Sequence, residues 1–391
     1  MSEPFTVVYD PSLASYDLGE NHPLRSERYT LTMSLLSMLG WLDSPDIVIE
    51  KPRMATISEL LLAHSYPYIQ AVEQGQAIAR GKRSQADLTL YGLGTSDDPL
   101  FPDLYDAAAL YTGATIQAME ALLEGRALHS YSPAGGQHHA QRASASGFCI
   151  YNDCAAALAV ALKAGRRVAY VDFDAHHGDG VQAAFYDEPR VLTISVHESG
   201  EYLFPGTGAA DETGGGEGRG ACINVPLPPL AGSEAILLAF DRIVAPALRA
   251  YAPDVVLTQM GVDTHHADPL THLTGSLALF PELAARLHEL VHECSEGRWL
   301  ITGGGGYDPF DIAPRAWTAF VGTVLGHDTA DVTLPNEWVD ASRAAGGNPP
   351  AHLLDDPAPG YTPLVDSGYL SVLHEIEINA LAELTQRHGR K

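Results

Sequence analysis

The amino-acid sequence predicts a single α/β domain built on a mostly parallel β-sheet. Short apolar runs with the character of buried strands alternate with stretches whose apolar residues recur at helical spacing, as in parallel βαβ units. Clusters of polar residues and glycines follow several of these runs. Because ligands of open parallel sheets bind beyond the carboxyl ends of the strands, we expect one active site at that edge.

Four apolar runs predict the clearest strands: Arg167–Phe173, Val191–Val196, Asp254–Met260 and Trp299–Thr302. Stretches between them predict helices over Ala155–Ala164, Ser233–Ala250 and Pro281–Cys294. We expect a catalytic domain over residues 1–340 and a C-terminal extension over residues 341–391 that packs on it or follows it. The extension contains proline-rich stretches and a last predicted helix over Ser371–Gln386.

Composition excludes some classes of function. The chain has 49 acidic and 23 basic side chains, a formal net charge of −26, so its surface repels phosphate and nucleic acid is a poor candidate partner. A cationic substrate would be attracted, although solubility alone explains the charge equally well. No apolar run approaches the roughly 18 residues of a membrane span, and the N-terminus does not resemble a signal peptide. The four cysteines form no C-x-x-C pair, so we expect a protein of the reducing cytoplasm. We expect no membrane partner. The oligomeric state is open.

The strongest chemical signal is the segment DFDAHHGDG, which begins at Asp172 at the end of a predicted strand. Asp174 and His176, two residues apart, present an oxygen and a nitrogen ligand on one face, and Asp263 directly after another strand supplies a third. Two carboxylates and one imidazole neutralise a divalent ion and leave a position open for water or substrate. The alternative is that these aspartates only cap a helix and hold no metal. The density of acids, histidines and glycines in the segment disfavours that alternative.

Two adjacent histidines point to the same site. His138 and His139 can both face one cavity, and Asp172 and Asp179 of the acidic segment can orient the two imidazoles. Pairing with a buried aspartate fixes the tautomer of a histidine and raises its pKa, as a general base and acid requires.

A glycine run after the last predicted strand ends in Tyr307. The residues Gly303–Gly306 let the backbone approach a ligand closely, but no Lys-Ser/Thr follows as in a phosphate-binding loop. A phenol beside a metal can donate a hydrogen bond to the oxyanion that develops when water attacks a carbonyl.

These motifs resemble those of the arginase-like histone deacetylase superfamily, in particular the class I deacetylases and the bacterial acetoin-utilisation deacetylases. HHA, GFCIYND, DFDAHHGDGV, FPGTG, GVDT and GGGGY occur in the family's order between about His22 and Trp338. The resemblance implies the arginase/deacetylase fold, with about eight strands and helices on both faces of the sheet. It also implies hydrolysis of the amide of acetyl-lysine in a protein or peptide, releasing acetate and free lysine.

The resemblance assigns roles to individual residues. It implies a zinc site, with ferrous iron as the alternative metal, at Asp174, His176 and Asp263. It implies a catalytic group made of His138, His139, Tyr307, Asp172 and Asp179. In that group His139 is the general base, His138 is its electrostatic partner and Tyr307 polarises the substrate carbonyl. A structural potassium ion is implied at Asp172, Asp174, His176, Ser195 and the backbone of Val196.

The resemblance also implies a narrow tunnel for the acyl-lysine side chain. Its substrate-binding residues are Asp97, Gly147, Phe148, Phe204 and Leu270. The two phenylalanines are its aromatic walls, and Asp97 holds the substrate backbone at the rim, with Asp98 as the alternative. Arg28 matches an arginine beside an internal channel for acetate.

Other functions remain as alternatives. An acetylpolyamine amidohydrolase shares this machinery, but its proline-rich P-P-G-H-H approach is replaced here by AGGQH, which favours acyl-lysine as the substrate. An arginase-like ureohydrolase needs more carboxylate ligands, for two manganese ions. A catalytically silent acyl-lysine reader would lack His139 or Tyr307, and both are present. Among protein substrates, acetylated metabolic enzymes are candidates.

One segment departs from the family pattern. His265 and His266 stand where class I relatives have small or apolar residues. They would alter substrate preference if they lined the rim, or they are surface residues without a role, which we favour. His177 and Asp153 are expected to be structural members of their motifs.

Overall fold

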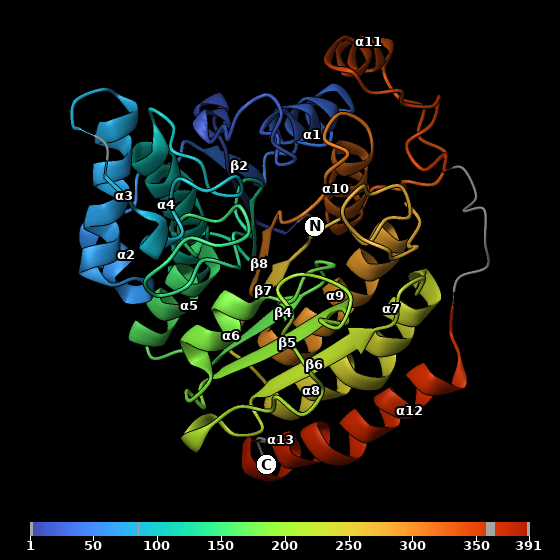
Figure 1. Cartoon of the computed structure of the whole chain (residues 1–391). Coiled ribbons are helices and arrows are strands. Elements are labelled where there is room, and N and C mark those ends of the chain that lie inside the picture. The colour runs from blue at the N-terminus through green and yellow to red at the C-terminus, as the bar shows by residue number, and fades with distance from the viewer. Residues whose placement is uncertain (1–2, 85, 357–363, 389–391) are drawn as a thin grey trace.

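The structure is a computed structural model that describes residues 3–84, 86–356 and 364–388. Its strands form one sheet in the order β2-β1-β3-β8-β7-β4-β5-β6, and all neighbouring strands are parallel. Helices surround the sheet (Figure 1). The prediction of an α/β fold with about eight parallel strands is confirmed.

The strands are β1 Phe5–Val8, β2 Ile47–Glu50, β3 His129–Ser132, β4 Val168–Asp172, β5 Val191–Glu198, β6 Cys222–Leu227, β7 Val255–Gln259 and β8 Trp299–Thr302. The four predicted strands correspond to β4, β5, β7 and β8, which are buried along their whole length. The sequence analysis missed the other four. β3 has the polar sequence HSYS although it is fully buried, so it shows no apolar run. The edge strand β2 has the apolar sequence IVIE although it is partly exposed, and no polar cluster drew attention to it.

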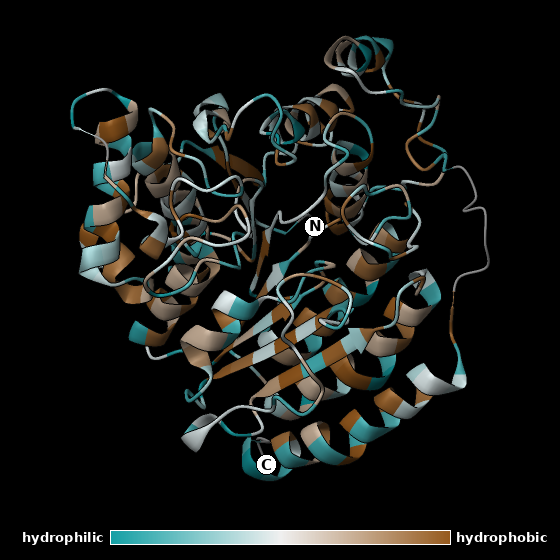
Figure 2. Ribbon diagram, in the orientation of Figure 1, coloured by the Kyte–Doolittle hydropathy of each residue, from teal (hydrophilic) through white to brown (hydrophobic). Residues whose placement is uncertain are grey.

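The helices are α1 Glu27–Met38, α2 Ile57–Ala63, α3 Tyr66–Ala79, α4 Leu104–Leu123, α5 Asp153–Lys163, α6 Asp179–Phe185, α7 Ser233–Ala239, α8 Ala245–Tyr251, α9 Leu279–Ser295, α10 Ile312–Val324, α11 Asn336–Ala345, α12 Ser367–Ile376 and α13 Ala382–His388. The predicted helix Ser233–Ala250 is α7 and α8 joined by a π-helical turn, Phe240–Val244. Figure 2 shows apolar residues concentrated in the strands and on the helix faces turned toward them. No helix among the described residues is long and apolar enough to cross a bilayer.

The order of the strands explains where the site forms. β3, β8, β7 and β4 are consecutive neighbours in the middle of the sheet. The two histidines follow β3, the glycine run follows β8, Asp263 follows β7, and the acidic segment ends β4. Because all four strands are parallel, these segments meet at one edge of the sheet.

The C-terminal helices pack against the rest of the chain. In α11 the buried Trp338 donates a hydrogen bond to the carbonyl of Leu31 in α1. α12 lies against β6 and α13 against α8 (Figure 1). The boundary predicted at residue 340 falls inside α11, and the division into a domain and an extension stays a prediction. Most of the proline-rich stretch 355–360 lies outside the described residues.

Candidate active site

Three predicted metal ligands lie together beyond the ends of β4 and β7. Nδ1 of His176 is 3.1 Å from Oδ1 of Asp174 and 2.9 Å from Oδ2 of Asp263. All three side chains are buried. Ligand atoms of the three residues lie close enough to share one ion.

The chemistry of this group fits a divalent metal. Two carboxylates are buried side by side, and within the described part of the chain their ion-pair partners are the histidines His138 and His176 rather than lysine or arginine. Buried carboxylates need a compensating charge, which a cation supplies. Burial and the neighbouring Asp174 raise the pKa of the Asp263 carboxyl well above its usual value, because two adjacent buried negative charges repel each other. A cation bound between the two carboxylates would offset that repulsion.

The surrounding backbone holds these carboxylates in place. The amides of Gly305 and Ala175 donate to Oδ2 of Asp174 and Oδ1 of Asp263, at 2.7 and 2.8 Å. Gln259 at the end of β7 donates to Oδ2 of Asp174 at 2.7 Å. A Cβ atom on Gly305 would lie 2.1 Å from Oδ2 of Asp263, so only glycine fits there.

The two histidines form one chain of hydrogen-bonding groups with two aspartates. Nδ1 of His138 is 2.8 Å from Asp172 and Nδ1 of His139 is 2.7 Å from Asp179. The Nε2 atoms of the two rings are 3.0 Å apart. Each aspartate thus orients one imidazole through Nδ1, and the two Nε2 atoms face each other.

The two imidazoles differ in protonation. Burial alone would lower the pKa of His138, but the carboxylates of Asp172 and Asp174 raise it to about 9. Burial and the nearby charge of His138 lower the pKa of His139 to about 4, against the effect of Asp179. The predicted rise in pKa therefore holds for His138 and is wrong for His139, because the pair cannot hold two positive charges in a buried site. An unprotonated His139 is available as a base.

Tyr307 reaches the site from the glycine run after β8. Its backbone amide donates to Oδ2 of Asp268 at 2.8 Å. Its ring packs edge-on against the rings of His176 and Phe148, with centroids 6.2 and 5.8 Å apart. Gly306, which precedes it, has φ of 137°, a conformation that side chains other than glycine rarely adopt.

A cavity of about 240 Å³ opens onto these groups. It is lined by Asp97, His139, Gly147, Phe148, His176, Leu203, Phe204, Leu270 and Tyr307. The five predicted substrate-binding residues all belong to this lining. Asp97 is exposed at the cavity, whereas Asp98 is buried, and burial and Asp97 raise its pKa to about 8. The geometry therefore favours Asp97 over Asp98 as the rim residue.

Backbone conformation places the aromatic wall. Phe148 has φ of 69°. This backbone conformation is unfavourable for any residue other than glycine, and it persists only where the surrounding structure enforces it. A Cβ atom on the preceding Gly147 would lie 2.5 Å from the ring of His139. The strained turn thus packs Gly147 against the ring of His139 and places Phe148 in the lining of the cavity.

The remaining predicted residues lie behind the site. In the register of β4 and β5, Asp172 is opposite Ser195, whose Oγ is 2.9 Å from Nδ1 of His197, and Val196 follows in β5. Arg28 is buried, donates to the carbonyl of Gly306 at 3.0 Å, and has a buried Nε–H without a partner among the described residues.

Several residues at the site were not predicted. Gln259 is a polar residue at the end of a buried strand, which is a usable signal. Gln141 donates to Oδ2 of Asp179 at 2.8 Å, and Asn152 holds the carbonyls of residues 138 and 140 while it caps α5. Asp153 accepts the amides of residues 136 and 137, as expected of a structural member of its motif.

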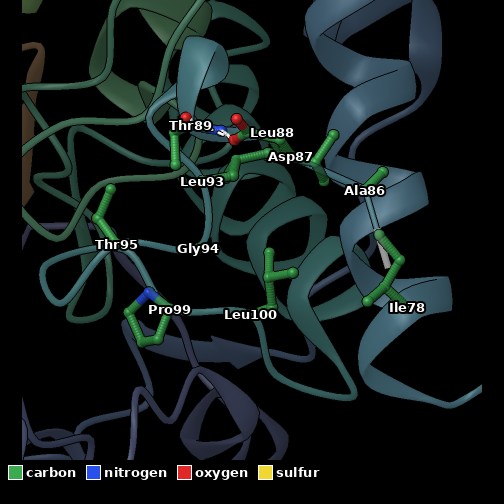
Figure 3. Close-up of a pocket in the computed structure, with 10 residues that line it drawn as sticks. All are labelled: Ile78, Ala86, Asp87, Leu88, Thr89, Leu93, Gly94, Thr95, Pro99 and Leu100. Carbon is green, nitrogen blue, oxygen red and sulfur yellow. Dashed lines mark hydrogen bonds between the residues drawn. The ribbon is translucent and has the colours of Figure 1, made fainter. Parts of the chain in front are cut away.

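A larger hollow of about 470 Å³ lies behind the loop that carries Asp97. Figure 3 shows its ten lining residues, most of them apolar or small. Among the described residues of its lining, Asp87 is the one ionisable group, and its carboxylate accepts hydrogen bonds from the amide and the hydroxyl of Thr89. We therefore assign the chemistry to the smaller cavity.

His265 and His266 do not line the cavity. Their Nε2 atoms lie 3.2 and 2.9 Å from the carboxylate of Asp356, and His265 is fully buried. The favoured interpretation, surface residues without a role, is wrong: they join the loop after β7 to the C-terminal part of the chain. Leu270 of the same loop does line the cavity.

We expect Asp356→Asn to lower the free energy of unfolding by about 2 kcal/mol at pH 7. Burial would raise the pKa of Asp356, but hydrogen bonds from His265 and His266 lower it from 3.8 to about 2. Because the folded pKa is the lower one, this stabilisation is complete above about pH 4 and is lost as the pH falls toward 2. Urea unfolding at several pH values measures it, with Asp355→Asn as the control. A loss that did not shrink below pH 4 would contradict the assignment.

The comparisons with known proteins agree with this geometry. The family model of the histone deacetylase domain matches residues 22–324. The chain is 42% identical over 333 residues to the acetoin utilization protein AcuC of Bacillus subtilis (strain 168), covering 85% of this chain and 84% of that one. It is 36% identical over 334 residues to AcuC of Staphylococcus aureus (strain MRSA252), covering 85% of each chain.

Solved structures show the same fold. The crystal structure of an HDAC homolog from Aquifex aeolicus superposes with a TM-score of 0.84 at 29% identity, covering 96% of this chain and all of that one. An HDAC homolog complexed with SAHA superposes with a TM-score of 0.80 at 30% identity and the same coverage of this chain.

Proposed function

The chain belongs to the histone deacetylase family, and we propose that it hydrolyses the amide of acetyl-lysine in a protein or peptide, releasing acetate and free lysine. The observation that carries the proposal is the convergence of His139, His176 and Tyr307 in a cavity walled by Phe148 and Phe204. Aromatic walls suit the apolar stem of a lysine side chain. The acetoin-utilisation relatives make acetylated metabolic enzymes the first candidates for the substrate.

The residues divide the reaction among them. A zinc ion, or ferrous iron as the alternative, held by Asp174, His176 and Asp263 would polarise the substrate carbonyl and acidify a water molecule. His139, unprotonated and held at Nδ1 by Asp179, takes a proton from the attacking water and returns it to the leaving amine. Tyr307 donates a hydrogen bond to the carbonyl oxygen as it becomes negative.

The positive charge of His138 contributes beside the base. At a pKa of about 9 it is protonated at neutral pH. Its positive charge offsets the negative charges of Asp172 and Asp174 and stabilises the negative charge that develops on the tetrahedral intermediate. A potassium ion at Asp172, Asp174, His176, Ser195 and Val196 remains an expectation from the family resemblance.

Two substrates test the proposal. The purified protein, loaded with zinc, should release acetate from an acetyl-lysine peptide faster than from acetylputrescine. The opposite preference would assign the chain to polyamine metabolism. Binding of the peptide without turnover of either substrate would support the silent reader instead.

We expect Phe204→Ala to raise KM for an acetyl-lysine peptide about tenfold and to leave kcat nearly unchanged. The ring centroids of Phe204 and His139 are 5.0 Å apart, and loss of one aromatic wall removes about 1.4 kcal/mol of binding, which is a factor of ten. Steady-state kinetics measure the effect, with the exposed Tyr202→Ala as the control. A fall in kcat at constant KM would contradict a binding role.

A further inference from the structure

A second group of histidines lies at the opposite edge of the sheet from the candidate active site. Glu3 precedes β1, His129 begins β3, and His288 and His292 are one helical turn apart on α9. We call Glu3, His129, His288 and His292 the amino-edge cluster. The strands are parallel, so the starts of β1 and β3 lie on the far side of the sheet from the acidic segment.

The four side chains converge on one point. Oε2 of Glu3 lies 2.7 Å from Nε2 of His129, 3.1 Å from Nε2 of His288 and 3.2 Å from Nε2 of His292. The Nε2 atoms of His129 and His288 are 3.1 Å apart. In a tetrahedral zinc site with bonds of about 2.0–2.1 Å, ligand atoms are about 3.3 Å apart. These four distances are within a few tenths of an ångström of that value, and all the ligand atoms of the cluster lie within 4.8 Å of one another.

The rings are also fixed in position before any ion binds. Trp299 packs against His129 edge-on and stacks on His288, with centroids 5.8 and 6.4 Å apart. His129 is 1% exposed, and a hollow of about 470 Å³ lined by Glu3, His129 and His288 provides a path from solvent. A pre-positioned donor set loses less conformational entropy on binding.

We propose that the amino-edge cluster is a second metal site, which binds a zinc-like divalent ion through one carboxylate and three imidazoles. Three nitrogen ligands and one oxygen suit zinc in tetrahedral geometry. All four positions are filled by the protein, as in structural sites, so the ion joins the start of the chain to β3 and α9.

The sequence HELVH over residues 288–292 matches the H-E-x-x-H pattern of zinc proteases, but a second hydrolytic centre does not follow. Glu289, which would be the general base, is exposed, and four protein ligands leave no position for water. The cluster therefore has a structural role.

Metal content separates the two sites. After zinc loading and desalting, the full chain should retain about two zinc ions, and either Asp263→Asn or His292→Asn should retain about one. His327→Gln is the matched control, because His327 lines the same hollow but stacks on Trp41, and it should retain both ions.

Spectroscopy and stability identify the site. In Asp263→Asn protein, Co²⁺ should give the intense visible absorption of a tetrahedral centre, and zinc should raise the midpoint of thermal unfolding. Adding Glu3→Gln or His292→Asn to that protein should abolish both effects, while circular dichroism shows that it remains folded. Asp263→Asn protein that retained no zinc and gave no tetrahedral cobalt spectrum would overturn the proposal.

Discussion

Replacing Asp263 by asparagine is expected to abolish deacetylation and to remove the metal of the active site. Asparagine has the same shape and can still accept the amide of Ala175, but it lacks the negative charge that the ion requires. Loss of the metal's stabilisation of the transition state, worth several kcal/mol, corresponds to about a thousandfold or more in kcat/KM.

A matched variant controls for the loss of one carboxyl group near the cavity. Asp98 is buried, and its pKa of about 8 means that it is mostly protonated at pH 7. Asp98→Asn therefore changes little charge and should retain both the metal and most of the activity. Asp263→Asn protein that kept full activity without metal would refute the assignment of the ligands.

Replacing Tyr307 by phenylalanine is expected to lower kcat by about 10²–10³-fold, with KM nearly unchanged. The phenol hydroxyl is lost, while the ring contacts with His176 and Phe148 and the backbone bond to Asp268 remain. Steady-state kinetics and metal analysis measure the result, with the exposed Tyr66→Phe as the control. An unchanged kcat with a higher KM would show that Tyr307 binds substrate without assisting the chemistry.

The residues of the active site could be predicted because their chemistry is dense and follows strand ends. Asp174, His176 and Asp263 stand directly after apolar runs, and the sheet brings these runs together. The strand β3, which precedes His138, was not predicted because its sequence is polar although all four residues are buried. Four residues with hydroxyl and imidazole groups carry no periodic pattern from which a strand can be recognised.

Features that depend on contacts distant in sequence could not be predicted. The lowered pKa of His139 results from burial and from the charge of its neighbour, which only the folded chain sets. The contact of His265 with Asp356 joins residues 91 positions apart. The amino-edge cluster draws its ligands from three separate segments, so the pattern on α9 by itself gave no indication of Glu3 or His129.

Acetate release from an acetyl-lysine peptide, before and after removal of metal, tests the central claim most directly. The chelated protein should lose turnover, and zinc should restore it in the wild-type chain but not in Asp263→Asn. Turnover that survived complete removal of metal, or that zinc restored equally in both proteins, would contradict a metal-dependent deacetylase built on Asp174, His176 and Asp263.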